Sequence, residues 1–124
     1  MIGSHKLVGQ YGGRFHFAQV DVEIIDFKST SKPEVILDLV SPSEIDVVYE
    51  DWKNSAILGV ERFLTKFPVE VRGKVFKIKN ILATLVDTED TTIEVTAYLA
   101  TYSAVYGDDS LPKINFKNSW EVED

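Results

Sequence analysis

The chain has 124 residues, of which 44% are hydrophobic and 27% charged, the length and apolar content of a single globular domain over residues 1–124. It contains no cysteine and two histidines, which excludes disulfides, thiolate nucleophiles, and metal sites built on thiolate or mainly on imidazole. Twenty acidic against thirteen basic side chains give a net charge of -7, which argues against nucleic-acid binding through bulk positive potential.

The clearest predicted strand runs from Arg14 to Phe27. Its apolar residues alternate with polar ones in the period of a strand with one buried face: Ala18, Val20, Val22 and Ile24 against Gln19, Asp21 and Glu23. Residues 28–33 are polar and predict a loop, and the alternation resumes as a second strand over residues 35–40. We expect these two strands to form a hairpin.

A helix is predicted to begin at or shortly after residues 41–44, Ser-Pro-Ser-Glu, which combine a capping serine, a proline preset for the first turn and a glutamate placed for a capping box. An apolar stripe at helical spacing follows, formed by Tyr49, Trp52, Ala56, Val60 and Phe63. Pro68 ends this helix. Valines at alternate positions around a turn at residues 72–73, and a long apolar run over residues 76–87, predict further strands.

Residues 91–106 fit two structures. Their β-branched and aromatic content favours a strand, whereas Asp90 and Thr91 at the start and Gly107 at the end are typical of helix boundaries. Sixteen residues are long for a strand and ordinary for a helix, so the residues alone leave both open. The tail, residues 111–124, predicts an edge strand.

One short segment carries a family resemblance. Residues 10–20, Gln-Tyr-Gly-Gly-Arg-Phe-His-Phe-Ala-Gln-Val, resemble the opening of domain IV of translation elongation factor G, where a Gln-x-Gly-Gly-Arg segment turns into the domain's long strand. Two glycines permit positive φ at such a turn, although a plain tight turn explains them equally well. Arg14 can present its fork of donors to a phosphate or a carboxylate.

The similarity continues in the same order along most of the chain, roughly from Lys6 to Glu121. Residues 56–64 resemble that domain's first helix, and residues 82–87 resemble its following strand. Residues 90–92, Asp-Thr-Thr, are similar to the start of its second helix. The resemblance therefore implies that residues 91–106 are a helix.

The fold that the resemblance implies is α+β, a mainly antiparallel sheet of four or more strands with two helices on one face, as in ribosomal protein S-five domain 2. We expect one core, containing Val20, Val22, Leu37, Trp52, Val60, Phe63 and Leu85. By analogy with the related domain, the Gly-Gly turn and the loop before the second helix should meet at one tip. The candidate binding residues of that tip are Gln10, Tyr11, Gly12, Gly13, Arg14, His16, Thr88, Glu89 and Asp90.

This chain departs from the family at the tip. Residues 87–90, Asp-Thr-Glu-Asp, are shorter and acidic and lack the histidine of the Gly-Ser-Tyr-His type loop of elongation factor G. Phe15 and Ala18 stand at positions where the family has glycine. The chain also has no Gly-x-x-x-x-Gly-Lys-Ser/Thr loop, so we expect no GTP to bind this chain and no GTP-driven translocation by it.

Two function classes remain. The first is a non-catalytic, translation-factor-like module that contacts the ribosome, structured RNA or a protein partner. The alternative is an enzyme or small-ligand-binding protein on the same fold. We favour the module, because no nucleophile or oriented carboxylate can be assigned beside His16 as a general base, and we expect no cofactor and no metal.

Charged clusters and the distribution of apolar residues lead to three further expectations. The carboxylates of residues 87–94 predict a solvated turn, because their spacing fits no calcium loop. Lysines at positions 74, 77 and 79 predict a solubilising edge strand rather than a phosphate-binding one. With no apolar run approaching about 18 residues and no basic-then-apolar N-terminus, we expect no membrane span, no secretory leader and a cytoplasmic location.

Overall fold

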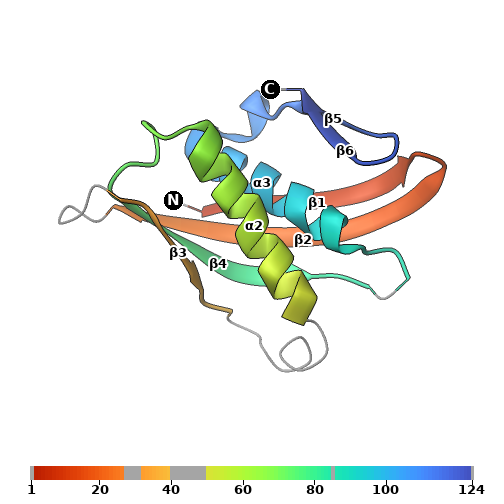
Figure 1. The fold of residues 1–124 in the computed structure, drawn as a ribbon, viewed down its shortest axis with the longest axis horizontal. Coiled ribbons are helices and arrows are strands. Elements are labelled where there is room, and N and C mark those ends of the chain that lie inside the picture. Colours follow the sequence, from red (N-terminus) through yellow and green to blue (C-terminus); the bar gives the residue numbers. More distant parts are fainter. Residues whose placement is uncertain (1, 27–31, 40–49, 85, 124) are drawn as a thin grey trace.

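The computed structural model describes residues 2–26, 32–39, 50–84 and 86–123. It is an α+β structure in which two helices, α2 and α3, lie on one face of a four-stranded sheet (Figure 1). The sheet order is β1-β2-β4-β3, and a separate two-stranded sheet holds β5 and β6. The elements are β1 (Ile2–Tyr11), β2 (Arg14–Asp26), β3 (Glu34–Leu37), α2 (Glu50–Lys66), β4 (Lys74–Leu82), α3 (Asp90–Tyr106), the short helix η1 (Asp108–Ser110), β5 (Lys113–Phe116) and β6 (Trp120–Glu123).

A long hairpin, β1–β2, forms one side of the main sheet. Its turn is the predicted Gly-Gly pair, since Tyr11 pairs with Arg14 and the two glycines between them have φ of 62° and 80°. Positive φ at both central residues is the geometry of a two-residue turn whose twist matches the strands. β1 itself carries no clear alternation in the sequence. Gly3 explains part of this, because a Cβ there would lie 2.3 Å from the backbone nitrogen of Ala104 in α3.

The expected hairpin between residues 14–27 and 35–40 is wrong. β3 pairs in parallel with β4, and β4 lies between β3 and β2. α2 connects β3 to β4, and a helical crossover is the connection that parallel strands require. β4 is therefore a central strand, not the solubilising edge strand expected from its lysines.

Residues 91–106, which fit both a strand and a helix in the sequence, are helical and form most of α3. α3 packs against β1 and β2, and α2 packs against α3 and the other half of the sheet. α2 has one buried stripe, which includes Trp52, Ala56, Val60 and Phe63, whereas α3 is buried over most of its circumference. Its low amphipathicity is the reason the sequence pattern was ambiguous.

Of the seven predicted core residues, five are buried in one hydrophobic cluster: Val20, Val22, Trp52, Val60 and Phe63. Leu37 is partly buried against this cluster, and Leu85 lies outside the described residues. The helix start proposed at residues 41–44 also lies outside them. α2 ends at Lys66, just before Pro68, as predicted.

Two further expectations are corrected. Residues 68–73 form turns instead of a strand, and β4 ends at Leu82 instead of continuing to residue 87. The tail pairs with itself as β5 and β6 and adds no strand to the edge of the main sheet. Within the described ranges, no helix has both the length and the apolar character needed to cross a membrane.

Candidate functional site

The β1–β2 turn and the loop between β4 and α3 reach the same end of the molecule (Figure 1). We call this end the tip and define it as residues 10–16 and 86–90. The two segments are at least seventy positions apart in sequence. They are joined by side-chain and backbone bonds, so the structure brings together the two segments expected at one tip.

Arg14 forms the outer link between the segments. Its Nη1 lies 2.7 Å from Glu89 Oε1, and its Nη2 donates to the carbonyl of Val86 at 3.4 Å. The side chain of Arg14 is still 51% exposed. A guanidinium carries five N–H donors, so this geometry orients the group while leaving donors directed to solvent.

Thr88 forms the inner link. Its hydroxyl donates to the carbonyl of Phe17 at 2.5 Å and accepts from the N–H of Thr84 at 2.9 Å. The N–H of Phe17 in turn donates to the carbonyl of Asp87 at 3.0 Å. Thr88 is buried, which corrects the expectation that it contributes to a binding surface. It fixes the loop to β2 instead.

The prediction that His16 belongs to the binding surface of the tip is also wrong, because His16 is only 1% exposed. As an even-numbered residue of β2 it points to the helix side of the sheet, like Ala18. Its ring centre lies 4.9 Å from that of Trp120 and 5.2 Å from that of Phe116, and its Nε2–H donates to the carbonyl of Tyr11 at 3.2 Å. His16 therefore packs the β5–β6 hairpin onto the sheet.

Tyr11 is half-buried in the same aromatic cluster, with its ring 5.2 Å from Trp120. Tyr11, a candidate binding residue of the tip, therefore does not provide an exposed aromatic ring there. The exposed aromatic residue of the tip is Phe15, which is 42% exposed on the opposite face of β2. One feature of the sequence could have indicated this residue: Phe15 stands at a position where the family that the chain resembles has glycine.

The two turn glycines have different surroundings. A Cβ on Gly12 would lie 2.6 Å from Phe116 Cδ1 and 3.0 Å from its carbonyl oxygen, whereas a Cβ on Gly13 would meet nothing within 4 Å. Gly12 thus lets β5 approach the turn closely. Gly13 is required only by its backbone angle.

The solvent-facing part of the tip is mixed in character. Gln10 and Asp90 are exposed, Glu89 is partly exposed, and Val86 is 77% exposed. The N–H of Glu89 donates to the hydroxyl of Thr92 at 3.2 Å, which fixes the start of α3. The surface that results offers one oriented guanidinium, carboxylates, an amide and two apolar side chains, a set suited to recognition by shape and hydrogen bonds.

The other charged clusters are largely paired. Lys74 lies 2.6 Å from Asp26, and Lys79 lies 2.8 Å from Asp38. The hydrogen bond between the last two lowers the pKa of the Asp38 carboxyl and raises the pKa of Lys79. Among the residues that the structure describes, no group of three or more histidine or acidic side chains is placed to hold a metal ion.

Comparison with protein-family models gives no match, and neither does comparison with curated proteins. Among solved structures, the chain is similar to the crystal structure of ttk003000868 from Thermus thermophilus, with a TM-score of 0.67 and 17% sequence identity. The match covers 84% of this chain and 15% of the Thermus chain. The likeness shows a shared fold, and this chain spans about a seventh of the length of that protein.

Proposed function

We propose that this chain is a non-catalytic, translation-factor-like binding module that contacts the ribosome, or another structured RNA, through its tip. The proposal includes the finer fold assignment, that of elongation factor G domain IV and ribosomal protein S-five domain 2. Its first support is the Gln-Tyr-Gly-Gly-Arg segment at residues 10–14, which turns into the longest strand, and the order of elements that follows it.

The observation that carries the proposal is the orientation of Arg14. Its bonds to Glu89 and Val86 hold the guanidinium at the end of a hairpin, half exposed. An arginine held in this way loses less conformational entropy on binding, and its free N–H donors match a phosphate or a base edge. Sequence-specific RNA recognition commonly uses such shaped contacts in loops and bulges.

The charge at the tip determines how binding should respond to salt. Arg14 is accompanied by Glu89 and Asp90, so the tip does not provide the row of cations that neutralises successive phosphates. Release of condensed counterions should therefore contribute little. We expect the affinity for ribosomes to fall less steeply with salt than that of a protein with a basic groove.

The similarity to part of the Thermus protein supports a modular role, since the same fold occurs there within a chain several times longer. This support concerns the fold alone, and the partner is inferred from the tip.

The test is co-sedimentation of the chain with purified ribosomes, with folding of each variant checked by thermal melting. Arg14→Ala should weaken binding by about 1–3 kcal/mol, because it removes a charge-assisted contact. Lys77→Ala and Lys79→Ala are the matched controls, since each removes one cation from β4, and both should bind normally. Normal binding by Arg14→Ala together with loss in the two lysine variants would place the site on β4.

A capture experiment from a cell lysate separates RNA from protein partners. Partners retained by the immobilised chain should be lost on ribonuclease treatment. Retention of one protein after ribonuclease treatment, with Arg14→Ala abolishing it, would show that the tip binds a protein and would refute the RNA assignment.

A further inference from the structure

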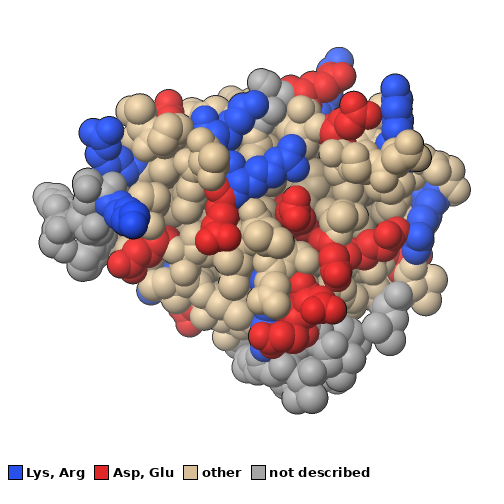
Figure 2. Space-filling model, viewed as in Figure 1, with Lys and Arg blue, Asp and Glu red and all other residues tan. Residues whose placement is uncertain are grey.

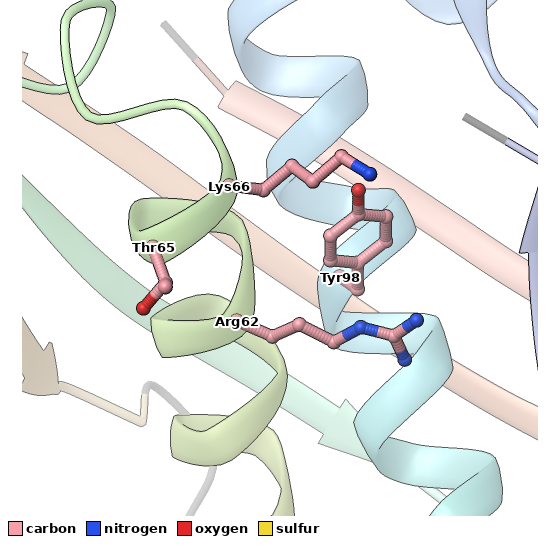
Figure 3. A pocket seen from close by; sticks show the side chains of 4 residues that line it. All are labelled: Arg62, Thr65, Lys66 and Tyr98. Carbon is pink, nitrogen blue, oxygen red and sulfur yellow. The ribbon is translucent and has the colours of Figure 1, made fainter.

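A hollow of about 560 Å³ lies between α2 and α3, on the face of the helix layer away from the sheet (Figure 3). It is lined by Arg62, Thr65, Lys66 and Tyr98, none of which belongs to the tip. Its volume falls within the range of pockets that hold small ligands. The chemistry of these four side chains therefore determines what the hollow can bind.

Arg62 is fixed over a rigid aromatic ring. Its guanidinium carbon lies 5.0 Å from the centre of the Tyr98 ring, a cation–π arrangement. Tyr98 is only 1% exposed, and its ring packs against Phe63 at 5.8 Å between centres. The guanidinium thus has a defined position above α3, although Arg62 itself is an exposed residue.

Lys66 follows Arg62 by one helical turn, which places both residues on the same face of α2. Figure 3 shows both side chains extending from α2 across to α3, with the Lys66 ammonium beside the Tyr98 hydroxyl end. Thr65 takes no part in this convergence, because its hydroxyl donates to the carbonyl of Glu61 at 3.1 Å. Two cations from one helix therefore meet above one phenol.

Arg62 differs from several other cations of the chain because it has no carboxylate partner among the described residues. Arg14, Lys74 and Lys79 each lie within 2.8 Å of a carboxylate oxygen. Among the described residues, no carboxylate forms an ion pair with Arg62. Figure 2 shows blue side chains over the C-terminal half of α2, with red side chains next to them and around the N-terminal end of the helix. An anion beside the Arg62 guanidinium would therefore be stabilised by a charge-assisted contact.

We propose that this hollow binds the phosphate group of a phosphate ester. An ester phosphate carries close to two negative charges at pH 7 and so matches two cations, and the arginine fork pairs with two of its oxygens at once. The lysine acts as a second point charge.

The direct test is a nuclear magnetic resonance titration of the unmodified chain with inorganic phosphate and with adenosine 5′-monophosphate. We expect saturable shifts confined to the amides around residues 62–66 and 98, and weaker binding of acetate, which carries one charge. Shifts that scatter over the surface, or equal binding of acetate, would overturn the proposal.

Paired variants test the two cations. Arg62→Gln with Lys66→Gln should weaken phosphate binding at least tenfold. The matched control, Lys113→Gln with Lys117→Gln, removes the same charge from the β5–β6 hairpin and should leave the affinity unchanged. Equal losses in the two double variants would show that only net charge matters and would contradict the site. Arg62→Lys keeps the charge and should show an intermediate loss.

A third titration, with a short single-stranded RNA that lacks a terminal phosphate, identifies the source of the phosphate. Competition by this RNA at the same amides assigns the site to a strand backbone, and competition by the monophosphate alone assigns it to a small ester. The site is independent of the proposed tip, so Arg14→Ala should bind phosphate normally. A loss in Arg14→Ala would contradict that independence and the location of the site.

Discussion

The interior of the helix–sheet layer and the tip are held together by different forces. In the interior, α2 and α3 approach so closely that a Cβ on Gly59 would lie 2.2 Å from the carbonyl oxygen of Glu94. At the tip, two segments are joined by an ion pair and by the hydroxyl of Thr88. Close packing transmits a change to the whole fold, whereas a polar link can be cut with a local effect. The tip can therefore vary its surface for binding while the interior cannot.

The largest expected effect tests the interior. Gly59→Ala should destabilise the chain by about 2–3 kcal/mol, because the new methyl group forces α2 away from α3. At an exposed helical position the same change stabilises, since alanine is the better helix former. Urea unfolding measures the difference, with Leu58→Ala at the exposed neighbouring position as control. A stabilised Gly59→Ala would mean that the helices are less tightly packed than described.

The next effect concerns the junction between the tip and the C-terminal hairpin. Gly12→Ala should cost about 2 kcal/mol and Gly13→Ala about 1 kcal/mol, because both residues have positive φ and only Gly12 lies against Phe116. Trp120 fluorescence, measured in a Trp52→Phe background, should change in the first variant and not in the second. Identical spectra and stabilities would show that β5 does not rest on the turn.

A smaller effect is expected at the inner link of the tip. Thr88→Val keeps the shape of the side chain but leaves the carbonyl of Phe17 and the N–H of Thr84 without their bonds, at a cost of about 1–2 kcal/mol. Thr91→Val, at an exposed position in the first turn of α3, is the matched control. Hydrogen exchange should speed up in residues 84–90 of Thr88→Val alone. Faster exchange throughout the chain would instead indicate that the tip and the interior unfold together.

The smallest expected effect depends on pH. Burial lowers the pKa of His5 below 6.5, and the nearby Asp108 only partly opposes this. The unfolded chain therefore binds a proton at His5 more readily than the folded chain does. The contribution of neutral His5 to the free energy of unfolding is complete above about pH 6.5, and it is lost as the pH falls toward the lowered pKa of the folded chain. His5→Gln should lose less stability than the unmodified chain between about pH 7.5 and about pH 5.5. An equal loss in both would assign the pH dependence to other groups.

Much of the local structure could be predicted from the residues. The alternation in β2 and the apolar stripe of α2 each express one buried face, so their period is visible in the sequence. The Gly-Gly turn was visible because positive φ restricts the residue type. Only the family resemblance identified α3 as a helix, since a helix buried nearly all round has no stripe.

The sequence by itself determined the elements with a single buried face and the turn between β1 and β2. It also indicated that Arg14 and Glu89, which are far apart along the chain, belong to the two segments of the tip. Only the tertiary structure decided that β2 pairs with β4 and not with β3, because pairing depends on which faces are buried across the whole sheet. It also decided that His16 and Thr88 are buried while Phe15 is exposed. Alternation separates the two faces of a strand, but which face and which end remain open to solvent depends on helices and hairpins far away in the chain.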